Sequence, residues 1–367
     1  MLNLILTFIT GIIVSIYAVS RVLKLAIARN LLDEPDKNRK IHTRSVPILG
    51  GLGLFIALAF AFTAFTFDGM PKGLIRTFGG IIALFMIGLK DDLLPSKPIR
   101  RLAYETLVSL VLIIGSDIRF TNMFGLFGFT QIDYWPSVIL TWLFIVGMIN
   151  AYNMIDGIDG LLGSISLLGA LCYAWIFFVY KDYHWAQFCL ALAGALIGFL
   201  YFNTYPARIF MGDSGSMLLG GAFSVMSLHF LDFTTFQSND LRLFFPPVIG
   251  ISIVAIPVFD MMVVFVTRMM RRVSPLKADR RHCHHRLLDL GLNHFQATMI
   301  LLAANLVVII FGYYLQMYFS MYTSLIFLTF FILGLEGLLL GLHIRRQKST
   351  IREITGEEKV VLLKVKL

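Results

Sequence analysis

The sequence is poor in charge: only 14% of its 367 residues are Asp, Glu, Lys or Arg, against about 25% in ordinary soluble domains. Hydrophobic residues make up 57% of the chain, and the mean hydropathy is +0.79. Apolar segments follow one another from Leu2 to His343 and leave no stretch long enough for a separate soluble domain. We therefore predict one integral-membrane domain, residues 1–343, followed by a charged cytoplasmic tail, residues 344–367. The alternating pattern at the end of this tail is compatible with a short strand.

Cysteine is scarce as well. Cys172, Cys189 and Cys283 form no close pair, which excludes a disulfide framework and a CxxC metal site. The first apolar run has no positive residue before it, and its length suits a spanning helix better than a cleaved signal peptide. We expect this run to remain in the protein as its first membrane helix.

The hydropathy pattern predicts an all-α polytopic membrane protein with about eleven transmembrane helices. Their approximate positions are residues 2–20, 46–66, 74–89, 101–115, 136–153, 160–180, 185–202, 214–231, 244–266, 298–315 and 322–343. Of the 31 Lys and Arg residues, 26 fall after odd-numbered helices or in the tail. Because positive residues concentrate in cytoplasmic loops, we predict the N-terminus outside and the C-terminus in the cytoplasm. The net charge of +9 is then a sign of topology, and we expect no nucleic-acid partner.

Five aspartates lie where predicted helices meet cytoplasmic loops. They are Asp91 and Asp92 in GLKDDL, Asp156 and Asp159 in NAYNMIDGIDGL, and Asp213 in FMGDSGS. Acids at membrane depth are costly and usually face a cavity, pair with a cation or carry function. Helix capping is an alternative for a single aspartate, but it does not account for five on one side. The pattern predicts an active site at the cytoplasmic face.

Spacing adds detail to this prediction. Asn153, Asp156 and Asp159 are three residues apart, which places them on one face of a helix over its last turns. Gly157 and Gly160 remove side chains beside them, which permits ligand approach or local unwinding; packing of helices through small residues is equally compatible. Mg²⁺ takes oxygen ligands and is typically held by carboxylates together with substrate phosphates. The acids therefore indicate phosphoryl transfer on a diphosphate.

Two basic loops accompany the acids. The loop 33–51 contains His42 and Arg44 before a turn rich in Pro and Gly, and it either binds an anionic headgroup or only marks the cytoplasmic side. The loop 268–291 has seven Lys or Arg residues around three histidines in four positions. Zinc is one interpretation, because His and Cys283 are suitable ligands, but no HExxH helix is present. Binding of a nucleotide diphosphate is favoured, since Arg matches phosphate geometry.

The motifs HTRSVPILGG, KDDL, NMIDGIDGL, FMGDSGS and DRRHCHH occur in this order over residues 33–291. As a set they resemble the motifs of the polyprenyl-phosphate N-acetylhexosamine-1-phosphate transferases. The HxHH form preceded by Asp279 is more similar to the branch of the WecA and TagO enzymes than to the related peptidoglycan-precursor branch of MraY. Two departures, Cys283 for a commoner aliphatic residue and Glu105 where relatives often have Gln, concern specificity.

The resemblance implies transfer of N-acetylglucosamine 1-phosphate from UDP-N-acetylglucosamine to undecaprenyl phosphate, with release of UMP. It also implies Mg²⁺ or Mn²⁺ as cofactor and a multi-pass protein of the bacterial inner membrane, in contact with membrane lipids.

Carried over by position, the family's motifs assign a role to each site residue. The implied metal ligands are Asp213 and Asn153. The implied catalytic acids are Asp91 and Asp92 near the lipid phosphate, and Asp156 and Asp159 on the nucleotide-sugar side. The implied nucleotide-sugar residues are His282, His284, His285 and Arg281, and the implied lipid-phosphate residues are His42 and Arg44.

Several alternatives stay open at this point. The donor is N-acetylglucosamine, another UDP-N-acetylhexosamine or UDP-MurNAc-pentapeptide, and the glycan pathway is not specified. Transfer is direct or passes through an aspartyl phosphate. A cation-coupled transporter is the alternative from another class, although acids clustered at one edge do not suit a midplane binding site. A homodimer is left open.

Overall fold

The described part of the chain contains thirteen helices and one pair of strands, each strand two residues long. The computed structural model describes residues 1–33, 46–65, 69–125, 128, 130–236, 247–272 and 281–364, without the side chains of 233–236 and 348–364. The helices are α1 (Leu2–Ala28), α2 (Gly50–Ala64), α3 (Lys72–Leu93), α4 (Pro98–Ser116), α5 (Tyr134–Ile155), α6 (Leu161–Val179), α7 (Tyr183–Asn203), α8 (Gly212–Phe236), α9 (Val248–Ile253), α10 (Ala255–Met270), α11 (Cys283–Asp289), α12 (His294–Tyr318) and α13 (Met321–Lys364). The strands are β1 (Leu32–Asp33) and β2 (Val46–Pro47).

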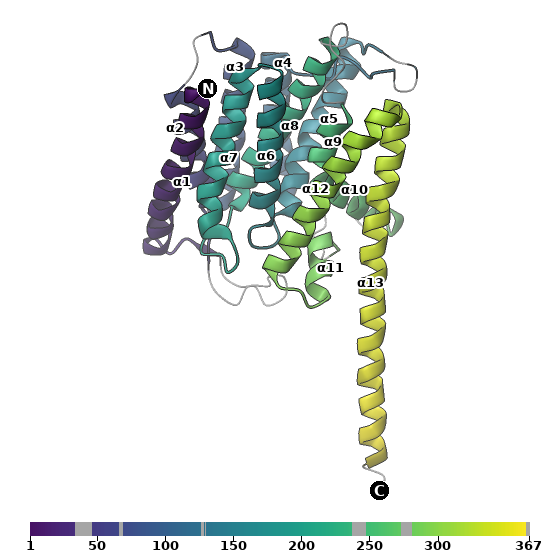
Figure 1. Ribbon diagram of the computed structural model, residues 1–367. Coiled ribbons are helices and arrows are strands. Elements are labelled where there is room, and N and C mark those ends of the chain that lie inside the picture. The colour runs from purple at the N-terminus through teal and green to yellow at the C-terminus, as the bar shows by residue number, and fades with distance from the viewer. Residues whose placement is uncertain are drawn as a thin grey trace.

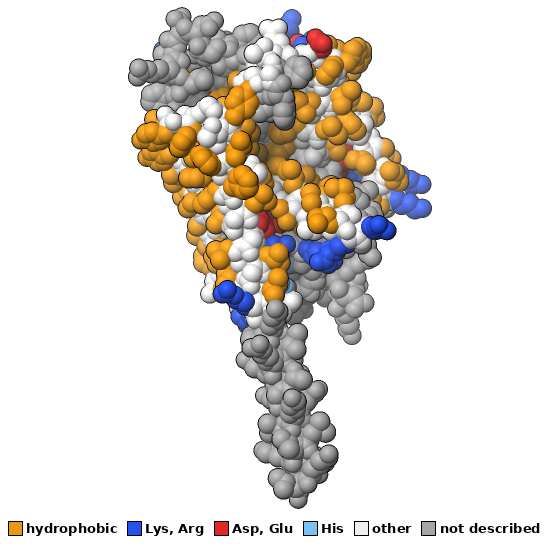
Figure 2. Space-filling model, turned by 90° about the vertical axis from the view of Figure 1, so that its right-hand side faces the viewer, with side chains coloured by type: hydrophobic (Ala, Val, Ile, Leu, Met, Phe, Trp, Pro, Cys, Tyr) orange, Lys and Arg blue, Asp and Glu red, His pale blue; other side chains and the backbone are white. Residues whose placement is uncertain are grey.

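The long helices run side by side as a bundle (Figure 1). The N-terminus lies at one end, and α13 projects far beyond the opposite end, where α11 also lies. Figure 2 shows a broad band of hydrophobic side chains over one face, with basic side chains gathered near the root of this projection and a smaller group at the other end. Such an apolar band flanked by charge is the surface of a membrane protein.

Eight helices in the described ranges are long and apolar enough to cross a membrane, which confirms a polytopic membrane protein. They are α1, α3, α5, α6, α7, α8, α12 and the first part of α13, Met321–Gln347. Each of the eleven predicted segments overlaps a helix, but α2 has only 15 residues and α4 carries Arg100, Arg101 and Glu105 in its first half. The number of eleven spans and the orientation therefore remain predictions.

Two sequence expectations are corrected. The ninth predicted span, 244–266, contains a break, because α9 ends at Ile253 and α10 starts at Ala255. Pro257 has no N–H to donate to the carbonyl of Ile253, and its ring would clash with that carbonyl in a continuous helix. The alternating end of the tail, which is compatible with a short strand, is helical as far as Lys364. Lys, Glu and Leu in this segment are good helix formers.

Small residues bring α1 and α7 close together. A Cβ atom on Gly194 of α7 would stand 2.3 Å from the carbonyl oxygen of Phe8 on α1, and one on Gly198 would stand 2.5 Å from Ser15. The two backbones therefore pack without intervening side chains, as is common between membrane helices.

Backbone hydrogen bonds join two of the sequence motifs at the end of the bundle where α11 lies. After β2, the N–H groups of Gly50 and Gly51 donate to the carbonyls of Phe210 (2.9 Å) and Met211 (2.8 Å). The N–H of Phe210 in turn donates to the carbonyl of Pro47 at 2.8 Å. The VPILGG segment is thereby fixed to the FMGDSGS segment that starts α8.

The end of α3 reaches the same place through a glycine. A Cβ atom on Gly88 would lie 2.4 Å from the carbonyl oxygen of Asp213, whereas one on Gly79 of the same helix would meet nothing within 4 Å. The contact at Gly88 places the KDDL motif directly beside the first turn of α8.

We expect Gly88→Ala to destabilise the detergent-solubilised protein by about 1–3 kcal/mol, because the added methyl group overpacks a backbone contact. Gly79→Ala is the matched control on the same helix, and we expect no loss there. Thermal unfolding followed by size-exclusion chromatography checks both. Equal unfolding temperatures for the two variants would contradict the packing described here.

Candidate active site

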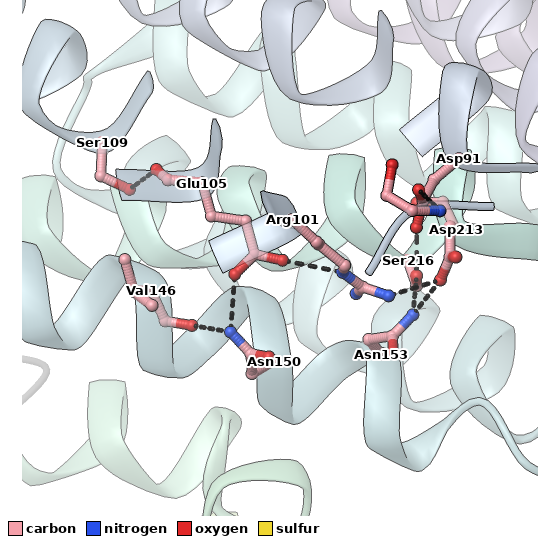
Figure 3. Close-up of polar contacts among 10 residues, drawn as sticks. Asp91, Arg101, Glu105, Ser109, Val146, Asn150, Asn153, Asp213 and Ser216 are labelled. Carbon is pink, nitrogen blue, oxygen red and sulfur yellow. Dashed lines mark hydrogen bonds and ion pairs between the residues drawn. The ribbon is translucent and has the colours of Figure 1, made fainter. Parts of the chain in front are cut away.

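Asp213 is the meeting point of three helices. It lies in the first turn of α8, where its Oδ1 accepts hydrogen bonds from Arg101 Nη1 of α4 (3.0 Å) and Asn153 Nδ2 of α5 (2.5 Å). Asn153 Nδ2 also donates to Ser216 Oγ at 2.9 Å, one turn further along α8. Figure 3 shows these side chains converging on one point.

A polar chain leads away from this point into the protein (Figure 3). Glu105 is 1% exposed and accepts hydrogen bonds from Arg101 Nε (2.9 Å) and Asn150 Nδ2 (2.8 Å). Arg101 therefore bridges a buried acid and the Asp213 carboxylate. The sequence interpretation missed Arg101 and Asn150, although Arg101 and Glu105 lie one helical turn apart, as do Asn150 and Asn153.

Asp91 and Asp92 are neighbours with different surroundings. Asp91 lines the cavity described below and accepts a hydrogen bond from the N–H of Ser96 at 2.8 Å. The two oxygens of Asp92 accept from the N–H groups of Asp213 (2.6 Å) and Ser214 (3.0 Å). Asp92 thus caps the N-terminus of α8 from another helix, since these amides have no partner within α8.

Asp156 and Asp159 do not share a helix face with Asn153, so this prediction is wrong. The helix α5 ends at Ile155, and the helical spacing does not continue through the following turn. Asp159 is buried at 6% exposure and accepts a hydrogen bond from the N–H of Ala207 at 3.0 Å. Its Oδ1 lies 3.2 Å from Nδ1 of His294.

Gly157 and Gly160, in the turn between α5 and α6, are required for different structural reasons. Gly160 has a φ of +76°, in the left-handed region that favours glycine, at the start of α6. A Cβ atom on Gly157 would lie 2.1 Å from Nε2 of His284. Gly157 therefore makes room for a histidine of α11, a contact that neither interpretation of this glycine anticipated.

The three histidines stand together at the start of α11. His282 Nδ1 lies 2.7 Å from Oδ2 of Asp260. The rings of His282 and His284 are stacked with centroids 5.5 Å apart, and the rings of His284 and His285 are 4.3 Å apart. Burial, and then the neighbouring His285, hold the pKa of His284 well below its usual value, so this imidazole is neutral at pH 7.

A cavity of about 500 Å³ connects the aspartate side to the histidine side. The predicted site residues that line it are Asp91, Asn153, Asp213, His282, His284 and His285. Its further polar residues are Ser96, Arg101, Glu105, Asn150 and Arg268. Asp92, Asp156, Asp159 and Arg281 are not among the lining residues, and His42 and Arg44 lie outside the described residues.

Asp156 lies among other acids beside the cavity, and its carboxyl group is difficult to ionise there. Burial, and then the carboxylates of Asp213, Asp92 and Asp159, raise the pKa of Asp156 to about 8. In the described part of the chain Asp156 has neither a hydrogen bond nor an ion pair to offset its burial and the repulsion from these carboxylates. A divalent cation would relieve it, and the oxygen atoms of Asp213 and Asn153 suit a hard cation.

A second group of ligating side chains fits a metal less well. Asp260, Cys283 and His284 offer ligand atoms within 4.8 Å of one another. However, both oxygens of Asp260 already accept hydrogen bonds from the start of α11, and Cys283 lines a separate apolar cavity. The donor set next to Asp213 is the better candidate cation site.

The fold and the cavity together define a multi-pass membrane protein in which acidic and basic side chains face one another at one end of a helical bundle. The sequence model of "Glycosyl transferase family 4" matches residues 74–231. A decaprenyl-phosphate N-acetylglucosaminephosphotransferase of Mycolicibacterium smegmatis is 31% identical over 82% of this chain and 79% of its own length. The chain therefore belongs to glycosyl transferase family 4, as the resemblance of its motifs indicates.

Two further relatives are similar over comparable lengths. A probable undecaprenyl-phosphate N-acetylglucosaminyl 1-phosphate transferase of Bacillus subtilis is 29% identical over 82% of each chain. An undecaprenyl-phosphate alpha-N-acetylglucosaminyl 1-phosphate transferase of Escherichia coli K12 is 29% identical over 77% of this chain and 76% of its own. The family match covers α3 to α7 and most of α8, with all five aspartates, whereas the histidine motif lies beyond it.

The raised pKa of Asp156 gives a test of the site's charge. Because the carboxyl group is largely protonated below pH 8, we expect dicyclohexylcarbodiimide, which reacts with protonated carboxyl groups, to label Asp156 at pH 6.5–7. Labelling should fall as the pH rises through about 8. Tandem mass spectrometry locates the adduct, and Asp156→Asn is the control. Absence of the adduct at pH 6.5, or its persistence unchanged at pH 9.5, would contradict the assignment.

Proposed function

We propose that this protein transfers N-acetylglucosamine 1-phosphate from UDP-N-acetylglucosamine to undecaprenyl phosphate at the cytoplasmic face of a bacterial inner membrane. The observation that carries the proposal is the cavity, because it joins the carboxylates around Asp213 to the histidines of α11 in one space. The relatives named for this reaction support it. The product starts a lipid-linked glycan.

The donor's diphosphate belongs on the histidine side in this proposal. His282, His284 and His285 line the cavity together with Arg268, and imidazole and guanidinium groups are suitable donors to phosphate oxygens. Arg281 precedes them and is a candidate for the same ligand. Asp156 and Asp159 do not line the cavity. Asp159 supports this side by fixing the turn after α5, through the hydrogen bond that it accepts from the N–H of Ala207, and Asp156 lies in the same turn.

The acceptor phosphate belongs near Asp91 and Arg101. Asp91 is the member of the KDDL pair that lines the cavity, so we assign alignment or deprotonation of the lipid phosphate to Asp91. Asp92, with both oxygens held by backbone amides, supports the turn that carries Asp213. A lipid-phosphate role for His42 and Arg44 remains a prediction.

Asp213 and Asn153 would hold the divalent cation, with Mg²⁺ as the first candidate and Mn²⁺ as the second. When bound, such a cation neutralises charge that develops on the diphosphate. Arg101 already contacts Asp213 at 3.0 Å, so it lies where it would neutralise phosphate charge beside the cation. Glu105 and Asn150 fix Arg101 from behind.

The reaction step follows from this placement. An oxygen of the lipid phosphate attacks the sugar-bearing phosphorus of the UDP-sugar, the bond from that phosphorus to the bridging oxygen breaks, and UMP leaves with that oxygen. Alignment and charge neutralisation are the main requirements of phosphoryl transfer. A covalent route would need a free aspartate nucleophile, and a trapped phosphoaspartate at Asp91 or Asp92 would contradict direct attack.

The first test is UMP release by detergent-purified protein from UDP-N-acetylglucosamine, with and without undecaprenyl phosphate and Mg²⁺. We expect release to require both, and Asp213→Asn to lower the rate by about 10²–10³-fold because it removes charge stabilisation at the reacting phosphates. Asp232→Asn is the matched control: Asp232 lies on the same helix and accepts a hydrogen bond from Thr121 at 2.8 Å.

Release of UMP from another UDP-sugar, but not from UDP-N-acetylglucosamine, would show that the proposed donor is wrong. Silence across a panel of UDP-sugars, with transport of cations by the same preparation, would favour the transporter alternative.

Gly157 provides a second test, on the donor side. Gly157→Ala places a methyl group against the imidazole of His284, so we expect a KM for the UDP-sugar raised by about tenfold, the effect of one displaced hydrogen bond to a charged group. The KM for the lipid should stay unchanged. Gly147→Ala, on α5 with nothing within 4 Å of the added methyl, should behave like the unsubstituted protein.

A further inference from the structure

Asp260 is a buried carboxylate outside the five aspartates of the motifs. It lies on α10, is 3% exposed and is not among the residues that line the 500 Å³ cavity. Burying an ionised carboxylate is costly unless it is paired and hydrogen-bonded. Its partners are His282 Nδ1 at 2.7 Å and the N–H of Cys283 at 2.8 Å. Both oxygens of the carboxylate are therefore hydrogen-bonded to the start of α11.

The first contact decides which side of the His282 ring remains for a ligand. With Nδ1 donating to Asp260, the other nitrogen, Nε2, lies on the far side of the ring, and His282 lines the cavity. Within the described residues this Nε2 has no hydrogen-bond partner. A carboxylate on one nitrogen of an imidazole fixes the orientation of the ring, as it does for histidines that bind metals. It also stabilises the imidazolium form, in which both nitrogens are donors.

The second contact fixes where the ring stands. The backbone N–H of Cys283 is at the first residue of α11, which has only seven residues. One carboxylate therefore holds the side chain of His282 and the backbone of its neighbour at the same time. The ring of His284 lies nearly parallel to the ring of His282, with 5.5 Å between the ring centroids and 8° between the ring planes.

We propose that Asp260 is a positioning residue for the donor site, which holds His282 so that Nε2 is directed toward the cavity. With both ring nitrogens protonated, Nε2 donates to the diphosphate of the UDP-sugar while Nδ1 donates to Asp260. The identity of this ligand rests on the proposed function, whereas the relation between Asp260 and His282 does not. Asp260 itself touches neither the substrate nor the reacting atoms.

The chain offers a matched control at the opposite end of α8. Asp182 contacts His229 Nε2 at 2.8 Å and accepts a hydrogen bond from the N–H of Trp185 at the start of α7. It is thus another carboxylate that joins an imidazole to the start of a helix, remote from the cavity. Asp182→Asn controls for the loss of such a pair as a purely structural element.

The kinetic test is a double-mutant cycle with Asp260→Asn and His282→Asn. Asn at position 282 keeps an amide donor near the position of Nδ1, so Asp260 stays hydrogen-bonded while Nε2 is lost. We expect each single variant to raise the KM for UDP-N-acetylglucosamine by about tenfold, the effect of one hydrogen bond to a charged group, with the KM for undecaprenyl phosphate unchanged. The double variant should be no worse than either single variant, because both remove the same interaction.

Losses that multiply in the double variant, or a KM for the UDP-sugar unchanged by Asp260→Asn, would overturn the proposal. The Asp182→Asn variant should leave both KM values unchanged, and a rise equal to that of Asp260→Asn would also overturn it. These outcomes separate positioning from a general contribution to folding.

A spectroscopic test does not depend on activity. In protein labelled with ¹⁵N at its 8 histidines, we expect the His282 signals, assigned through His282→Asn, to show a protonated Nδ1 hydrogen-bonded to a carboxylate. Asp260→Asn should shift these signals and Asp182→Asn should not; signals unchanged by Asp260→Asn would refute the pairing. If the unsubstituted protein releases no UMP while the shift occurs, the proposed function fails and the pairing stands.

Discussion

The start of α8 is the constraint on which the site depends. The first N–H groups of a helix have no partner within the helix, and leaving them unpaired in a protein interior is costly. Here a carboxylate from α3 accepts two of them. The segment just before α8 is hydrogen-bonded to the start of α2. Because Asp213 belongs to this same turn, its place is settled by backbone contacts before any ligand is considered.

Glycine is what allows these contacts. The membrane helices could be predicted from the length of the apolar segments alone, and each predicted span overlaps a helix of the structure. The pattern does not reveal which glycines touch a neighbouring backbone: Gly88 does and Gly79 does not, although both sit in the same apolar helix. The break before Pro257 was foreseeable from its missing N–H, whereas hydropathy alone favoured a continuous span.

The sequence motifs predicted which residues gather at the site better than they predicted what each residue does there. Asp91, Asn153, Asp213 and the three histidines do line one cavity. Asp92 and Asp159 look the same as these acids in the sequence, but they do not line the cavity. Their oxygens accept hydrogen bonds from backbone N–H groups far away in the sequence, which only the tertiary structure reveals. Asp260 was overlooked, although a lone acid within the apolar run AIPVFDMMVV was itself a signal of function.

The turn between α5 and α6 is held from outside the cavity. The Asp159 carboxylate contacts the N–H of Ala207 and His294, its own carbonyl accepts from Thr298 at 3.0 Å, and the N–H of Gly160 donates to Asn203 at 3.1 Å. The conformational entropy of this turn is therefore lost when the chain folds and not again when a ligand arrives. A site whose backbone is ordered in advance retains more of its contact energy as affinity.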